Sequence, residues 1–194
     1  MRIRARSQDM KIICLASYRG QIELSIKPET ALLVNNKPFF IPHFTSDVRS
    51  LPCVALRICR LGRNIDQRFA ARYYDAVAAA LDFSAYDCMS AARERGESLS
   101  AYNAFDNSFA ISKWTDKQEE DSMHLNISVN GNTNTFGAMI ISPMEAIALV
   151  SRYFKLCTGD IIAISIDAER QKLDINDKIE VANNSEVLIS MNIK

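Results

Sequence analysis

The stretch from Val48 to Asp87 constrains the fold most, because it combines two apolar runs with carboxylates. The first run is Cys53 to Leu56, and the second, Ala76 to Phe83, brings Asp82 and Asp87 to its end. Both runs have the composition of buried segments. An ionised group sheltered from water needs a compensating charge, so buried carboxylates at a strand end are typical of a cation or substrate site.

Length and composition indicate one domain with a real core. The chain has 194 residues, 48% of them apolar, and 23 basic side chains balance 23 acidic ones. A net charge of zero gives no field to hold nucleic acid or an anionic membrane, and no apolar run approaches the roughly 20 residues of a membrane span. The start is basic without the apolar core of a signal peptide, which predicts a cytoplasmic protein. We expect residues 1–9 to be a disordered extension and 10–194 to form the domain.

The five cysteines are widely spread, odd in number and without a C-x-x-C pair. This pattern is neither a disulfide framework nor a zinc site. We expect reduced, structural thiols.

Hydrophobic periodicity predicts a mainly β domain with a few short helices. Alternation or apolar runs favour strands over 10–15, 31–34, 39–41, 104–114, 124–129, 133–141, 161–166, 179–182 and 187–193. Asn35 to Lys37 reads as the turn of a short hairpin. Helices are predicted over 66–74, with Asp66 as cap, over 86–95, and from Pro143 to about Lys155. Ala76 to Phe83 stays open, because its alanines favour a helix and its alternation a strand.

Five segments, in order, resemble one family of enzymes. They are Lys27–Leu33, Leu56–Ile65, Asp82–Asp87 against D-x-[ST]-A-R-D, Ala104–Ser108 against K-x-F-D-G-S, and Gly159–Ile162 against G-D-[LV]-I. From about Met10 to Lys194 the chain resembles the short, single-domain form of the fumarylacetoacetate hydrolase family.

The resemblance implies an α+β, mainly β fold, a mixed β-sandwich roll that usually pairs into a homodimer. Enzymes of this family hydrolyse or decarboxylate acylpyruvates and related 2-oxo acids with Mg²⁺ or Mn²⁺. A hard cation prefers carboxylate oxygens and stabilises the enolate formed on C–C cleavage. The family supplies three carboxylates to the metal, two from an E-x-E pair and one from the D-x-[ST]-A-R-D segment.

Asp82 stands at the third of these positions, as a residual metal ligand, whereas the E-x-E positions fall on Leu51 and Cys53. Leucine has no donor atom, and a thiol is a soft ligand for a hard ion. One carboxylate is too few to dehydrate Mg²⁺. We therefore expect no bound metal cofactor.

Other positions of the family pattern have changed as well. Neither of the two histidines, His43 and His124, lies in the N-terminal segment that carries the family's catalytic histidine. Tyr86 replaces the arginine of D-x-[ST]-A-R-D, and Asn103 replaces the lysine before F-D-G-S. The expected threonine and glycine loop reads Ala163 to Ala168, without a glycine.

The preferred hypothesis is a family member that has kept the fold and lost the parent reaction, acting as a binding or partner subunit. The alternative is an active hydrolase or lyase with a reorganised, metal-independent pocket for a small 2-oxo acid. No catalytic residue is assigned, although Cys53 could be a nucleophile if a base or cation activated it. Lys27 and Asp87 are the predicted substrate-binding residues, unless Asp82 and Asp87 are structural relics held by backbone amides or by Arg57 and Arg60.

Overall fold

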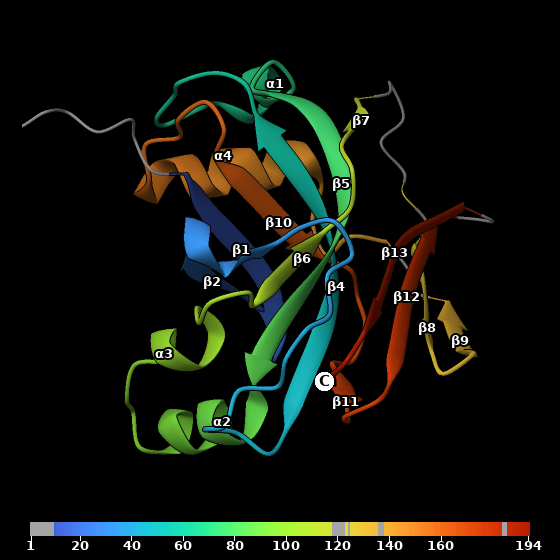
Figure 1. Ribbon diagram of the computed structural model, residues 1–194. Coiled ribbons are helices and arrows are strands. Elements are labelled where there is room, and N and C mark those ends of the chain that lie inside the picture. The colour runs from blue at the N-terminus through green and yellow to red at the C-terminus, as the bar shows by residue number, and fades with distance from the viewer. Residues whose placement is uncertain (1–9, 118–122, 124, 136–137, 184–185) are drawn as a thin grey trace, which may run out of the picture.

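Two β-sheets organise the computed structural model, which describes residues 10–117, 123, 125–135, 138–183 and 186–194 (Figure 1). The larger sheet runs in the order β2-β1-β10-β4-β5-β6-β3, with β11 added to β4 and β7 added to β5. Its strands are β1 (Lys11–Tyr18), β2 (Gln21–Pro28), β3 (Leu32–Leu33), β4 (Val48–Ile58), β5 (Tyr74–Ala85), β6 (Phe109–Ile111), β7 (Thr115–Asp116), β10 (Ile161–Ser165) and β11 (Gln171–Leu173).

The two longest strands, β4 and β5, pair antiparallel at the centre of this sheet. The segment that the sequence left open, Ala76 to Phe83, lies within β5. It pairs with β4 on one side and with β6 and β7 on the other. Hydrogen bonding on both sides outweighs the weak helical preference of its alanines.

The second sheet has the order β13-β12-β8-β9 and packs against one face of the first. Their shared core joins Leu56, Leu81 and Phe83 to Ile127 and Val181. This arrangement confirms the mixed, mainly β sandwich that the sequence predicted. The strands of the second sheet are β8 (Leu125–Val129), β9 (Asn132–Thr135), β12 (Lys178–Asn183) and β13 (Glu186–Asn192).

The other face of the large sheet carries a second buried cluster. Small side chains there, Cys14, Cys53, Ala55, Ala80 and Ala163, pack with larger ones that include Ile12, Phe109, Ile111 and Ile161. On this side Lys27 of β2, an edge strand, reaches Phe83 and Ser108 beside β6. We call this concave side the inner face of the roll.

Short helices lie at opposite ends of the large sheet, with α1 and α4 at one end and α2 and α3 at the other (Figure 1). Asp66 caps α1 by accepting from Arg68 N, as predicted, but that helix ends at Ala70 before the chain enters β5. The helix predicted over 86–95 is confirmed, and Gly96 follows it with φ of +68°. The helical elements are α1 (Gln67–Ala70), α2 (Tyr86–Glu94), α3 (Ser100–Asn103), α4 (Pro143–Tyr153) and a 3-10 turn, η1 (Glu29–Ala31).

The hairpin predicted around Asn35 to Lys37 is wrong. Asn35 and Asn36 do form a bend with positive φ, but the segments on its two sides do not pair with each other. Leu32–Leu33 pairs in parallel with β6, and Phe39 forms a parallel bridge with Ile193. Long-range pairing, which a local turn signal cannot reveal, decides the path of this segment.

The residues 1–9 and His124 lie outside the described part of the chain. Within the described part, no helix is long and apolar enough to cross a membrane.

The N-terminus of α4 provides a test of local stability. Ser142 accepts a hydrogen bond from Glu145 N, and the Glu145 side chain accepts from Ser142 N, which completes a capping box. We expect Ser142→Ala to lower the free energy of unfolding by about 1 kcal/mol in a urea titration. Ser17→Ala is the control, because Ser17 is exposed and makes no side-chain hydrogen bond with the described residues. Equal stability of the two variants would contradict this role for Ser142.

Candidate functional site

A buried ion pair between Lys27 and Asp82 forms the centre of the candidate site. Lys27 is 0% exposed and Asp82 is 3% exposed, and Lys27 Nζ lies 2.7 Å from Asp82 Oδ1. The same ammonium donates to Phe83 O, Ser108 O and Ser108 Oγ at 2.9–3.1 Å. Its three protons match these three acceptors, so Asp82 Oδ1 is balanced by charge and receives no hydrogen bond.

A second cation, Arg170, approaches the other oxygen of the same carboxylate. Arg170 Nη1 lies 3.7 Å from Asp82 Oδ2 and donates to Ser84 Oγ at 3.1 Å. No described residue accepts a hydrogen bond from Arg170 Nη2 or Nε. One carboxylate therefore faces two cations.

The strand register places Leu51 and Cys53 on the same inner face as Asp82. Leu51 lies opposite Asp82 and Cys53 opposite Ala80, and residues directly opposite in a sheet share a face. Both side chains are buried. Leu51 offers no donor atom, and the described residues contain no group of three or more His, Cys, Asp or Glu side chains that could hold a metal ion.

The thiol of Cys53 is not activated. Burial raises its pKa well above the ordinary value, and the charge of Asp82 raises it further. The neutral thiol directs Sγ toward Leu51 O at 3.5 Å. A buried cysteine in this state behaves as a small apolar side chain.

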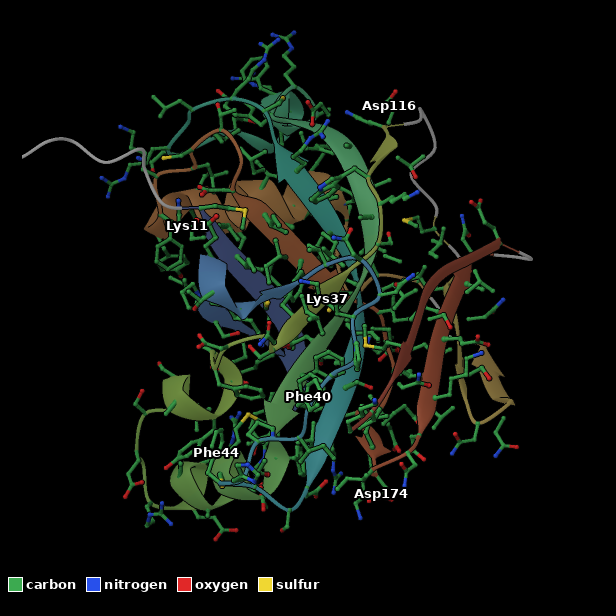
Figure 2. All side chains as sticks on the ribbon, in the orientation of Figure 1. Lys11, Lys37, Phe40, Phe44, Asp116 and Asp174 are labelled. Atoms are coloured by element: carbon green, nitrogen blue, oxygen red, sulfur yellow. The ribbon has the colours of Figure 1, made fainter. Side chains whose placement is uncertain are left out.

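Asp87 anchors the segment that enters β4. It accepts from Thr45 Oγ1 at 2.5 Å, from Ser46 N and Oγ at 2.9 Å each, and from Cys88 N at 2.8 Å. Burial raises the pKa of Asp87, but these hydrogen bonds outweigh it and hold the pKa well below the usual range. Phe44, labelled beside α2 in Figure 2, belongs to the same anchored segment, and Cys88 Sγ lies 3.3 Å from its carbonyl oxygen.

A cavity of about 790 Å³ lies beside this centre. Leu51 and Arg170 line it, whereas Lys27, Asp82 and Asp87 are not among its lining residues. Substrate binding by Lys27 and Asp87 stays a prediction. The wall contains side chains from β1, β2, β4, α2 and the loop after β10, namely Ala16, Ser17, Tyr18, Arg19, Glu23, Arg49, Leu51, Tyr86, Met89, Ser90, Arg93, Glu94, Ser165, Ile166, Asp167, Ala168, Glu169 and Arg170.

Sequence reasoning did not identify the arginines of this cavity. Arg49 lies two residues before Leu51 on β4, so strand alternation could have placed it on the same face. Arg170 follows β10 in a loop, where no local periodicity exists to predict its direction.

Comparisons with known proteins agree with this architecture. The model of the fumarylacetoacetate hydrolase C-terminal domain matches residues 16–182. The chain is 29% identical to oxaloacetate tautomerase YcgM of Escherichia coli over 171 residues, 78% of each chain. It is 26% identical to the human mitochondrial oxaloacetate tautomerase FAHD1 over 177 residues, which cover 88% of this chain and 79% of the human one.

Solved structures share the fold at lower identity. A fumarylacetoacetate hydrolase family protein of Yersinia pestis superposes with a TM-score of 0.87 at 24% identity, covering 96% of this chain and 93% of that one. Fumarylpyruvate hydrolase of Pseudomonas aeruginosa, solved with Mn²⁺ and pyruvate, gives 0.85 at 19% identity, with 98% and 93% covered.

The ion pair can be tested by removing one or both partners. We expect Lys27→Met to lower the free energy of unfolding by about 3–5 kcal/mol, because it removes the nearer cation and leaves buried Asp82 with Arg170 alone, at 3.7 Å. The double variant Lys27→Met/Asp82→Leu should recover most of that loss in urea unfolding, since both charges of the buried pair are gone and Arg170, which is 19% exposed, keeps its hydrogen bond to Ser84 Oγ. Lys37→Met, at an exposed lysine labelled in Figure 2, is the control. Additive losses in the double variant would contradict the pairing.

Asp87 should show a pH-dependent contribution. Because its folded pKa is lowered, its ionised form stabilises the fold fully above the unfolded pKa of about 4, and this stabilisation fades as pH falls from there toward the folded pKa. We expect Asp87→Asn to lose about 1–2 kcal/mol at pH 7 and clearly less at pH 3 in denaturant unfolding. Asp106→Asn, at an exposed position, should show little change at either pH. A loss for Asp87→Asn that is independent of pH would refute this account.

Proposed function

The chain belongs to the fumarylacetoacetate hydrolase family, and we infer that it has kept the family fold and lost the metal-dependent reaction. The observation that carries this proposal is the pairing of Asp82 with Lys27 at 2.7 Å. Asp82 is the one carboxylate that matches a metal ligand of the family, and a cationic side chain already balances it.

The donor set around Asp82 does not fit Mg²⁺ or Mn²⁺. These ions need several oxygen ligands, and the two partner positions on the inner face carry the side chains of Leu51 and Cys53. The Cys53 thiol is held neutral by burial, so it supplies no thiolate either. We derive no metal-dependent step for this chain.

The local charge also opposes a divalent cation. Lys27 and Arg170 place two positive charges within 2.7 and 3.7 Å of the Asp82 oxygens. A divalent ion bound to these oxygens would lie close to both cations, and both would repel it. A divalent ion at Asp82 would have to displace the Lys27 ammonium from its four oxygen neighbours, which are Asp82 Oδ1, Phe83 O, Ser108 O and Ser108 Oγ. No other described side chain would take the place of the ammonium beside these oxygens.

We propose, accordingly, a non-catalytic homologue that acts as a binding protein or a partner subunit and pairs into a homodimer as the family resemblance implies. A hydrolase or lyase with a metal-independent pocket is the second candidate, because the cavity beside Asp82 is large and carries arginines that could hold a 2-oxo acid. Activity assays without metal separate these two functions.

The proposal predicts that metal neither binds at Asp82 nor supports turnover. After dialysis against EDTA, we expect Mg²⁺ and Mn²⁺ to leave the melting temperature unchanged, although saturation at 100 times Kd would stabilise a specific site by about 2.7 kcal/mol. Oxaloacetate tautomerisation and acylpyruvate cleavage should be no faster with the protein than in buffer alone. The Escherichia coli oxaloacetate tautomerase serves as the positive control for the first assay.

Two results would overturn parts of this proposal. A saturable Mn²⁺-dependent stabilisation that Asp82→Asn abolishes, with turnover to match, would show that the metal reaction survives. Turnover in EDTA that Asp82→Asn leaves unchanged would favour the metal-independent enzyme.

A further inference from the structure

Positive charge gathers at the end of the molecule that carries α1 and α4, although the chain as a whole has no net charge (Figure 1). Residues 60–72 and 152–155 contain six cationic side chains and one carboxylate, and we call these two segments the basic end. Figure 2 shows side chains with nitrogen tips that project outward around α1. A net charge of zero removes the long-range field of the chain but leaves a local field wherever the charges separate.

Hydrogen bonds hold the two segments of the basic end side by side. Gly62 and Leu156 exchange backbone hydrogen bonds at 2.8 and 3.0 Å, and Asn64 N donates to Ser151 O at 2.9 Å. The hydroxyl of Ser151, a buried residue, accepts from Ile65 N at 2.9 Å. The exposed side chains of the two segments therefore belong to one surface.

Most cations of the basic end have no acidic partner. Its single carboxylate, Asp66, pairs with Arg68 at 3.2 Å. The acidic residues that follow the two segments, Asp75 and Asp160, pair with Arg57 and Lys11 instead. Five positive charges are therefore available to an anionic partner. The exposed cations that no described carboxylate pairs with are Arg60, Arg63, Arg72, Arg152 and Lys155.

The basic end also exposes large apolar side chains. Leu61 is 58% exposed, Phe69 41% and Tyr153 63%. Each of them has a cation on both sides of it in the sequence. Apolar side chains that project among cations suit the boundary between the headgroups and acyl chains of an anionic bilayer. The flanking cations are Arg60 and Arg63 for Leu61, Arg68 and Arg72 for Phe69, and Arg152 and Lys155 for Tyr153.

These apolar groups favour a bilayer over nucleic acid. Single-stranded nucleic acid binds by stacking its bases on free aromatic rings. The guanidinium carbons of Arg68 and Arg72 already lie 4.7 and 5.4 Å from the ring centroid of Phe69. Leu61 has no ring, and an aliphatic side chain gains free energy only where it leaves water. A bilayer therefore uses both the cations and the apolar side chains of this surface.

We propose that the basic end binds the surface of an anionic lipid bilayer, with its five unpaired cations on the lipid headgroups and with Leu61 and Tyr153 inserted among them. No residue of the basic end lines the cavity beside Asp82. The membrane contact therefore adds a partner to the proposed function and does not depend on the loss of the metal reaction.

Sedimentation with vesicles tests this proposal. Vesicles of phosphatidylcholine with one third phosphatidylserine should bind the protein at about 0.1 M salt, and vesicles of phosphatidylcholine alone should not. Salt at about 0.5 M should release most of the bound protein, because the Debye length falls from about 10 Å to about 4 Å. Equal binding to both kinds of vesicle, or binding to neither, would overturn the proposal.

Variants of the cations show whether this surface makes the contact. Arg63→Gln/Arg152→Gln should weaken binding to the phosphatidylserine vesicles about 25-fold, because each cation near an anionic bilayer strengthens binding about fivefold. Lys37→Gln/Lys113→Gln is the matched control, since it removes the same charge from exposed lysines outside the basic end. Equal weakening in the two double variants would assign the binding to net charge and refute the proposed surface.

Variants of the apolar side chains test insertion. Leu61→Gln and Tyr153→Ser should each weaken vesicle binding about threefold or more, because each removes apolar area that leaves water in the bilayer. Both side chains are more than half exposed, so the fold should persist, and an unchanged midpoint of urea unfolding checks this. Vesicle binding that neither variant weakens would contradict insertion.

Two soluble polyanions separate the lipid surface from other partners. A short DNA strand of mixed sequence and polyglutamate, compared with the vesicles at equal concentrations of negative charge, should both bind more weakly. Tighter binding of the DNA strand would assign the basic end to nucleic acid, and tighter binding of polyglutamate would assign it to an acidic protein. Either result would overturn the membrane proposal and leave the loss of the metal reaction standing.

Discussion

Burial of a carboxylate and an ammonium together is the constraint on which the rest of this structure depends. Asp82 lies on the central strand β5, and Lys27 lies on β2, an edge strand. Their contact brings the edge of the sheet across to its centre and closes the roll on its inner face. Either charge alone would be strongly destabilising in this position, so the two residues can be lost together far more easily than singly.

The same pairing changes what the inner face can bind. Lys27 is the internal counter-ion of Asp82, and the positions of β4 that share the face of Asp82 carry Leu51 and Cys53. Arg170 then adds a charge that no carboxylate fully balances. If the metal reaction is lost, as we propose, fixed cations of the chain itself stand beside the carboxylate to which the family resemblance assigns a metal ion.

Sequence reasoning located the elements that hold this site but not the contacts within it. The apolar runs of β4 and β5 and the helix from Tyr86 were evident, and alternation would put Leu51 and Cys53 on one face. The strand β2 and the burial of Lys27 were not evident from the sequence. Residues 17–21 read only as a polar break, and Asp82, the partner of Lys27, lies 55 residues away along the chain. The wrong hairpin at Asn35 has the same cause, since Phe39 pairs with Ile193 at the far end of the chain.

Anomalous scattering at the manganese edge, from crystals grown in MnCl₂, tests the central claim most directly. We expect Lys27 Nζ beside Asp82 and no manganese peak within about 2.2 Å, an ordinary ligand distance, of the carboxylate oxygens. A six-coordinate manganese ion bound to Asp82, with Lys27 displaced from it, would contradict the account.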